Sequence, residues 1–132
     1  MKEELLSLIK NSYSPYSKYA VSAIVLTNDG NKFKGVNVEN ASFGGTICAE
    51  RNAINNAISN GYKRGDFKAL YVMVKGDNIA FPCFICRQTI VEFFKGEEML
   101  VLFSENSSKS YLMNDILTHP FSVEDLKWSQ GL

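Results

Sequence analysis

One uninterrupted apolar run near the middle of the chain, residues 69–74 (ALYVMV), constrains the fold more than any other feature. A strand of this composition has no polar face to offer to water, so it is buried on both sides, as in a sheet covered by helices. The run is about six residues long, far shorter than the roughly 20 apolar residues that cross a membrane. We therefore expect a helix-covered sheet and no membrane attachment.

The flanking segments alternate between the periodicities of strands and of helices. Turns are marked by Gly, Pro and Asn between these segments. The predicted strands are residues 19–27, 32–38, 69–74 and 99–103, with a further short one at 109–113. The predicted helices are residues 3–10, 48–59 and 86–94, with short helical pieces at 113–117 and 123–128.

This order of elements predicts an α/β fold. The first two strands are joined by Asn28-Asp29-Gly30-Asn31, a strong turn signal, and form a β-hairpin. Helices and strands then alternate, which favours a three-layer α-β-α arrangement with a mixed sheet of about five strands. No repeat, low-complexity segment or linker divides the sequence, so residues 1–132 are expected to form a single domain.

The charge balance argues against a long nucleic acid as partner. Fourteen Lys and Arg are matched by fourteen Asp and Glu, and the formal net charge of zero lacks the basic excess that grips a polynucleotide. The first residues, MKEELLSLIKNS, place acids where a signal peptide carries basic residues. These features favour a small-molecule partner and a cytoplasmic location.

Three cysteines and a single histidine are the least ordinary part of the composition. Cys48 begins one predicted helix, and Cys83 and Cys86 stand in the sequence PCFIC at the start of another. The free N–H groups and the dipole of a helix N-terminus stabilise thiolates. Two residues between cysteines is also the spacing that lets two sulfurs bind one tetrahedral zinc ion.

Three interpretations of these cysteines are open. Buried, inert thiols are common in protein cores, and a redox Cys-x-x-Cys pair occurs in thioredoxin-like proteins but leaves Cys48 without a role. A zinc ion held by three thiolates gives all three cysteines a role. His119, in the tail beside a proline, has no ligand-like spacing and is expected in an exposed loop. The fourth zinc position would then stay open for water, as in catalytic sites, and closure by Asp or Glu is the less common alternative.

The cysteine spacing resembles the signature of zinc-dependent deaminases: Cys48-Ala49-Glu50 is followed, after 31 residues (51–81), by Pro82-Cys83-x-x-Cys86. The similarity is closest to the cytidine deaminase family, small homotetrameric enzymes that act on the free nucleoside. Further matching pieces are SPYSKY (14–19), GVNVENAS (35–42), CAER (48–51), PCFICRQ (82–88) and FSxEDL (121–126). Their order and spacing imply the cytidine-deaminase-like fold over most of the chain.

Glu50 is the expected general acid and base. Zinc lowers the pKa of bound water, attack on C4 of a cytosine needs a proton on N3, and the departing amine needs another. Because Glu50 lies in the same predicted helical turn as a ligand, one carboxyl can serve both steps; the alternative is an ordinary first-turn acid. Three thiolates (−3) on Zn²⁺ (+2) leave negative charge, and Arg51 and Arg87 adjoin ligands and are candidates to donate to sulfur. The alternative for both is a solvated helix surface.

The substrate-binding residues follow partly from spacing and mostly from the resemblance. Asn37 and Glu39 have i, i+2 spacing, so on an extended segment both side chains face one way and suit sugar hydroxyls. The resemblance implies that this pair binds the ribose 3′-hydroxyl, that Tyr19 flanks the pyrimidine, and that the carbonyl of Ala49 accepts from the amino group. It also implies a set of residues lent by neighbouring subunits: Ala41, Phe43 and Phe121. The alternatives are a polar strand end and plain core residues.

The expected function is zinc-dependent hydrolysis of cytidine and 2′-deoxycytidine to the uridines and ammonia, in pyrimidine salvage. One alternative is a deaminase of the same fold for another small molecule, such as blasticidin S, against which Glu39 argues. The others are a non-catalytic zinc-binding module and a polynucleotide deaminase, which the neutral charge disfavours. Phe84 and Ile85 depart from the family's usual Gly and small residue, so the Phe84 ring is expected either in the core or over the pocket.

Overall fold

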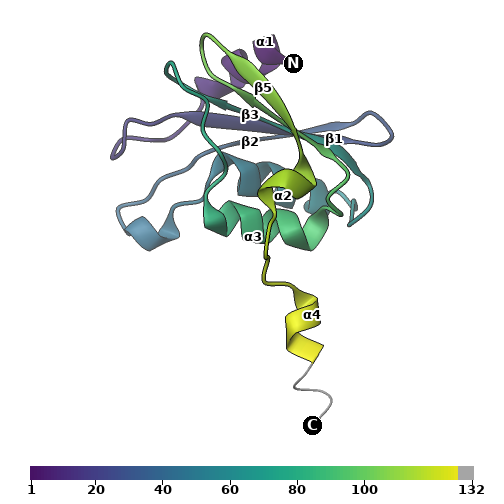
Figure 1. The fold of residues 1–132 in the computed structure, drawn as a ribbon. Helices are drawn as coiled ribbons and strands as arrows, with labels where there is room; N and C mark the ends of the chain where they lie inside the picture. Colours follow the sequence, from purple (N-terminus) through teal and green to yellow (C-terminus); the bar gives the residue numbers. More distant parts are fainter. Residues whose placement is uncertain (128–132) are drawn as a thin grey trace.

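The computed structural model describes residues 1–127, and among these five strands form one sheet flanked by helices (Figure 1). The strands are β1 (Val21–Thr27), β2 (Lys32–Val36), β3 (Phe67–Val74), β4 (Met99–Phe103) and β5 (Ser108–Leu112). The α-helices are α1 (Lys2–Ile9), α2 (Ala49–Ser59), α3 (Phe84–Phe93) and α4 (Val123–Leu126), and 3₁₀ helices lie at Phe43–Gly45 (η1) and Met113–Ile116 (η2). The predicted α/β fold with a mixed sheet is confirmed.

The strand order, β2-β1-β3-β4-β5, positions the site. β1 is antiparallel to both of its neighbours, β2 and β3, so those two strands run in the same direction. β4 is parallel to β3, with α3 between them in sequence, and β5 adds an antiparallel edge. Because β2 and β3 point the same way, their carboxyl ends meet at one edge of the sheet, and the chain leads from there into α2 and α3.

Helices cover both faces of the sheet: α1 lies on one face, and α2 and α3 lie on the other (Figure 1). The side chains of β3 divide between the two faces. Leu70 and Val72 belong to the main core beneath α2 and α3, whereas Met73 packs with Leu5 of α1 and Ile24 of β1. β3 is therefore buried on both sides, as its apolar run predicted.

Gly35 in β2 allows α2 to approach the sheet closely. A Cβ atom at this position would lie 2.5 Å from the carbonyl oxygen of Ala49 and closer still to the amide nitrogen of Ala53. Both are backbone atoms of α2, so no side chain can move aside to make room. The absence of a side chain at Gly35 thus sets how close the first turns of α2 lie to the sheet.

The structure differs from the predicted boundaries mainly at the ends of elements. The strand predicted at 32–38 ends at Val36, because Val38 pairs outside the sheet in isolated bridges. The helical piece predicted at 113–117 is a 3₁₀ helix. Trp128, where the last predicted helix ends, lies outside the described residues. Among residues 1–127 no helix has the length and apolarity that crossing a membrane requires.

Candidate functional site

The topology brings the three cysteines together. Cys48 immediately precedes α2, Cys83 immediately precedes α3, and Cys86 lies in the first turn of α3. Both helices follow the edge of the sheet where β2 and β3 end, so segments 35 positions apart in sequence meet there. The Sγ atoms of Cys48 and Cys83 are 3.8 Å apart, and all three Sγ atoms lie within 4.8 Å of one another.

This cluster fits a zinc ion. Zn–S bonds of about 2.3 Å in a tetrahedron place the sulfurs about 3.8 Å apart. In the part of the chain that the structure describes, the cluster consists of these three thiols, and His119 is exposed in the tail. Three protein ligands leave one tetrahedral position for another molecule, which is the arrangement of catalytic zinc sites.

The thiols influence one another's ionisation. A hydrogen bond from the Cys86 thiol, with further contributions from Arg51 and Cys83, lowers the pKa of Cys48 to about 5 despite its partial burial. The interaction with Cys48, together with burial, raises the pKa of Cys86 well above its usual range. A thiolate at Cys48 therefore disfavours a second thiolate at Cys86, and a bound divalent cation would offset this repulsion.

Arg51 places positive charge beside the thiols. Its Nη2 donates to the carbonyl oxygen of Thr46 at 3.2 Å and lies 4.0 Å from the Sγ of Cys48. Burial by itself lowers the pKa of Arg51, but the hydrogen bond and charge of Cys48 outweigh it and raise that pKa. The guanidinium therefore stays charged next to the cluster.

Glu50 is a buried carboxyl in the first turn of α2, with 6% of its surface exposed. Burial raises the pKa of Glu50 to about 7, and the charge of Cys48 adds to this rise. A carboxyl that titrates near neutral pH can both accept and donate a proton. Burial and the charge of Glu50 also raise the pKa of Tyr19, so the Tyr19 phenol lies close enough to sense this carboxylate.

Asn37 and Glu39 share a buried face, with Asn37 7% and Glu39 9% exposed. The Oδ1 atom of Asn37 accepts hydrogen bonds from the Val21 amide, at 2.9 Å, and from the Ser12 hydroxyl. Its Nδ2 donates to the carbonyl oxygen of Tyr19 at 2.7 Å. Asn37 therefore fastens the segment that leads into β1, a structural role that its i, i+2 spacing with Glu39 did not indicate.

Glu39 holds the same loop from the other end. Its Oε1 accepts from the amides of Tyr16 and Ser17, at 3.0 and 3.1 Å, and its Oε2 accepts from the Ser17 hydroxyl. The Ser17 hydroxyl bond, supported by these amides, lowers the pKa of Glu39. Glu39 also lines a mostly apolar hollow of about 270 Å³ together with Tyr16, Ser17, Phe43 and Thr46.

Sequence reasoning missed Ser12 and Ser17 as partners of these two residues. Ser17 belongs to the SPYSKY piece of the resemblance, and Ser12 lies just before it. A serine in a loop, however, has many local hydrogen-bonding options, and its partner 22 or 25 positions away depends on the fold. No pattern in a single sequence would have identified these bonds.

Ala49 is fully buried, and its carbonyl oxygen lies against β2 at Gly35. Its N–H belongs to the first turn of a helix, where amides have no intrahelical acceptor. The N–H of Ala49 is therefore free to donate to a ligand. The role predicted for its carbonyl stays a prediction.

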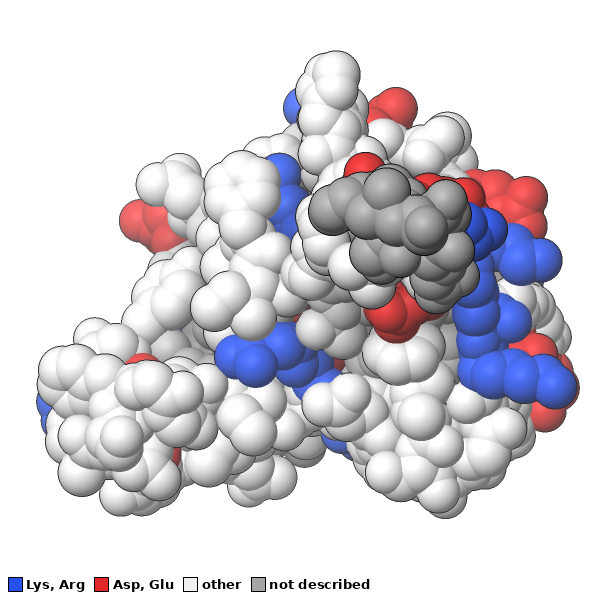
Figure 2. Space-filling model, turned by 90° about the horizontal axis from the view of Figure 1, so that it is seen from below, with Lys and Arg blue, Asp and Glu red and all other residues white. Residues whose placement is uncertain are grey.

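The residues expected to be lent between subunits are exposed. Ala41 is exposed, Phe43 is 76% exposed and Phe121 is 58% exposed, so the alternative that they are core residues is wrong. Phe84 and Ile85 are also largely exposed. Figure 2, which views the molecule from below Figure 1, shows a mostly uncharged surface with Lys and Arg gathered mainly along one flank.

Arg87 donates to backbone oxygens rather than to sulfur. Its Nε bonds the carbonyl of Pro82 at 2.8 Å and its Nη1 bonds the carbonyl of Ile116 at 3.4 Å. The Phe84 ring is 80% exposed beside this guanidinium, so it does not enter the core. Donation from Arg87 to a thiolate stays a prediction.

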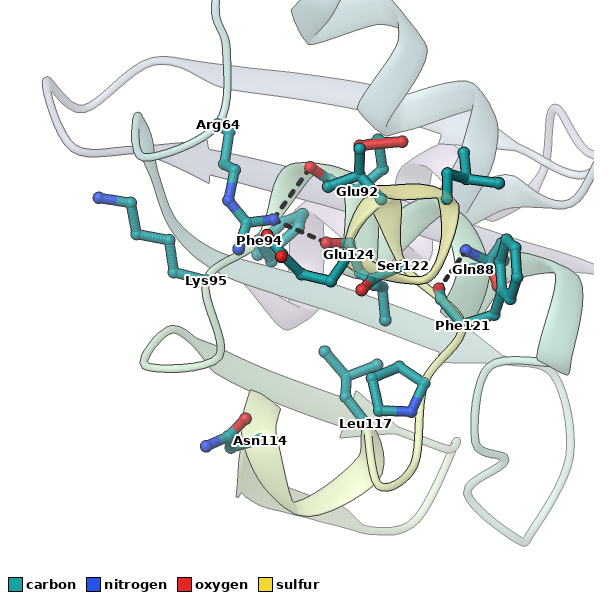
Figure 3. Close-up of a pocket in the computed structure, with 14 residues that line it drawn as sticks. Arg64, Gln88, Glu92, Phe94, Lys95, Asn114, Leu117, Phe121, Ser122 and Glu124 are labelled. Atoms are coloured by element: carbon teal, nitrogen blue, oxygen red, sulfur yellow. Dashed lines mark hydrogen bonds between the residues drawn. The ribbon is translucent and has the colours of Figure 1, made fainter. Parts of the chain in front are cut away.

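A larger cavity of about 460 Å³ lies between α3 and the tail (Figure 3). Arg64, Gln88 and Phe121 are among the residues that line it, and neither the three cysteines nor Glu50 does. It is therefore separate from the thiol cluster.

Three converging thiols at the N-termini of two helices, with a buried carboxyl in the first turn, form the site of a zinc-dependent deaminase. The family model described as the cytidine and deoxycytidylate deaminase zinc-binding region matches residues 1–102. The chain therefore belongs to the cytidine and deoxycytidylate deaminase family, as the cysteine spacing suggested.

Individual relatives match over most of their length. The chain is 41% identical to the probable cytidine deaminase of Dictyostelium discoideum, covering 94% of this chain and 86% of that one. It is 32% identical to the cytidine deaminase of Mycoplasma genitalium, covering 90% and 91%. The crystal structure of cytidine deaminase from Burkholderia pseudomallei is similar with a TM-score of 0.86 at 37% identity, covering 90% of this chain and 94% of that one.

Proposed function

We propose that this protein hydrolyses free cytidine and 2′-deoxycytidine to uridine and 2′-deoxyuridine, releasing ammonia. The observation that carries the proposal is the position of Glu50, a buried carboxyl in the same helical turn that follows the Cys48 thiol. A carboxyl held near neutral pKa beside an open metal position suits proton transfer and serves no purpose in a purely structural zinc module.

Cys48, Cys83 and Cys86 are the proposed zinc ligands. When bound, zinc supplies a Lewis acid that acidifies water at the open position. The N-termini of α2 and α3 and the guanidinium of Arg51 offset the negative charge of the three thiolates. Their combined positive potential keeps the site from repelling the attacking nucleophile.

Glu50 moves both protons of the reaction. It accepts a proton from the attacking water and donates it to N3 of the pyrimidine as the new C4–O bond forms. It then transfers the second proton to the amino group, the C4–N bond breaks, and ammonia leaves. The second proton comes from the new C4 hydroxyl, so one water hydrogen ends on N3 of the uracil, the other leaves in ammonia, and the water oxygen becomes the C4 carbonyl. The raised pKa of Glu50 makes both of its protonation states accessible near neutral pH.

Asn37 and Glu39 retain hydrogen-bonding capacity for the sugar. One of the two Nδ2 hydrogens of Asn37 is used by Tyr19, and the Glu39 carboxylate accepts three bonds of the roughly four it can take. A sugar 3′-hydroxyl can accept from the first and donate to the second. Cytidine and 2′-deoxycytidine both carry this group, which is why we propose both as substrates.

Other groups complete the proposed nucleoside site. The Tyr19 ring flanks the pyrimidine near Glu50, and the free N–H of Ala49 is a donor for a pyrimidine oxygen. We further propose a homotetramer in which neighbouring subunits contribute Ala41, Phe43 and Phe121. The exposure of these residues and the weakly charged surface in Figure 2 support such an interface.

The proposed setting is a single-domain enzyme of pyrimidine salvage in the cytoplasm. The high coverage of relatives of similar length supports one domain. Three free thiols that must stay reduced to hold zinc favour a reducing compartment.

A substrate panel tests the function. Ammonia release from the zinc-loaded protein is measured with cytidine, 2′-deoxycytidine, cytosine, deoxycytidylate, blasticidin S and a short single-stranded DNA. We expect turnover of the two nucleosides and much slower turnover of the other compounds. Cytosine, for example, lacks the sugar that Asn37 and Glu39 are proposed to bind. Preferential turnover of blasticidin S or DNA would support those alternatives instead. A zinc-loaded protein inactive on every compound would be a non-catalytic module.

A further inference from the structure

The Arg87 side chain contacts three residues around Cys83, namely Phe81, Pro82 and Phe84. Its Nε donates to the carbonyl of Pro82 at 2.8 Å, whereas the backbone amide of Arg87 makes the ordinary helical bond to the carbonyl of Cys83 at 2.9 Å. The guanidinium carbon lies 4.6 Å from the centroid of the Phe84 ring and 6.0 Å from that of Phe81. One side chain therefore contacts the chain on both sides of Cys83.

Of the three thiols, that of Cys83 depends most on such support. Cys86 is fully buried in α3, and Cys48 is half-buried with the Arg51 guanidinium beside it. Cys83 is exposed, and its side chain makes no capping bond to α3. The direction of its sulfur is therefore set by the backbone of the turn rather than by packing around the thiol.

We propose that Arg87 is a positioning residue for the metal centre: it fixes the Pro82–Cys83 turn so that the third thiolate stays directed at zinc. The flat guanidinium lies over the Phe84 ring and simultaneously reaches a carbonyl, a combination that a lysine ammonium does not reproduce. The exposed Phe84 ring thereby gains a role, because it supports the arginine that holds the turn.

Arg64 provides a matched control at the opposite end of α3. Its Nη1 donates to the carbonyls of Val91 and Glu92 at 2.7 and 3.1 Å, drawn as dashed lines in Figure 3. Like Arg87, it donates to two backbone carbonyls, but these belong to the last turn of α3, at the end of the helix away from Cys83. An effect common to both arginines would be general helix anchoring, and an effect confined to Arg87 would be positioning of the ligand.

Zinc retention distinguishes these outcomes without any substrate. Zinc-loaded wild type, Arg87→Met, Arg87→Lys and Arg64→Met are challenged with a chelator, and zinc release is followed with a zinc indicator. We expect zinc affinity to fall about 10- to 100-fold in Arg87→Met, as for other residues that orient metal ligands. Arg87→Lys, which keeps a donor but loses the planar contact, should lie between, and Arg64→Met should match wild type.

Cobalt substitution reports the ligand directly. The sulfur-to-metal charge-transfer absorption of the Co²⁺ protein scales with the number of bound thiolates, so Arg87→Met should lose about one third of the intensity given by three thiols. Wild-type zinc retention and spectrum in Arg87→Met, or equal zinc loss in Arg64→Met, would overturn the proposal. If Arg87→Met does not fold, zinc retention is measured in Arg87→Lys and Phe84→Ala instead. Zinc retention equal to that of wild type in both variants would overturn the proposal. The readout is metal binding, so it stands or fails separately from activity on cytidine.

Discussion

The residues proposed to bind substrate are the same residues that organise the site's own chain. Asn37 holds the Val21 amide and the Tyr19 carbonyl, and Glu39 holds the amides of Tyr16 and Ser17. These internal bonds fix the orientation of both side chains before any sugar arrives. Recognition and local folding therefore depend on the same polar atoms, and substitutions here should affect both.

Replacing Asn37 by Ala should lower the free energy of unfolding by about 1–3 kcal/mol, because the Val21 amide and the Tyr19 carbonyl lose their hydrogen bonds to the buried Asn37 side chain. The KM for cytidine should rise as well. Urea unfolding measures the first effect. Asn56→Ala is the control, because Asn56 is exposed and its hydrogen bond to the Lys34 carbonyl is long, at 3.3 Å. Equal stability of the two variants would contradict the structural role of Asn37.

At the scale of elements, the site exists because two helices begin at the same edge of the sheet. Sequence patterns predicted the two helix starts to within one and two residues, since turns and apolar periodicity are local. The approach of Cys48 to Cys83 depends on β1 lying between β2 and β3, which makes those two strands parallel. Strand order is a long-range property that no local pattern encodes, so the residues alone left a shared zinc site as one of three interpretations, and the resemblance favoured it.

The same distinction explains the other expectations. The role of the 69–74 run as a doubly buried strand followed from composition alone. The exposed position of Phe84 did not, because it depends on the Arg87 guanidinium that lies over the ring. The partners of Glu39 likewise come from a loop whose path is set by tertiary contacts.

Gly35→Ala tests the contact between α2 and β2. The added methyl group would meet helix backbone, so we expect a loss of about 1–3 kcal/mol or more in the free energy of unfolding. Zinc affinity should fall with it, because the displaced helix starts beside Cys48. Gly44→Ala is the control, since a Cβ there has no atom within 4 Å. Unfolding and chelator assays showing no difference between these variants would contradict the role of Gly35.

On the scale of the whole molecule, balanced charge and exposed aromatic residues describe a protein suited to neutral ligands and to self-association. The formal net charge is zero, and Phe43 and Phe121 are more than half exposed. Exposed aromatic residues of this kind favour contact with another chain. The proposed tetramer would cover them.

Light scattering should therefore give a mass about four times that of one chain, as proposed from the resemblance. Phe121→Asp should lower both that mass and the activity, because burying a charge in an interface is unfavourable. Leu6→Asp is the control, since Leu6 is 40% exposed on α1, on the other face of the sheet. A fully active monomeric wild type would contradict the shared site.

The proton-transfer role of Glu50 is tested most directly by Glu50→Gln. Gln has nearly the same shape but cannot exchange a proton, so kcat for cytidine should fall by about 10²- to 10⁴-fold or more. Zinc content measured on the same sample should remain one ion per chain, because the three thiols are intact. Turnover close to that of wild type, in a variant that retains its zinc, would contradict the assignment of Glu50.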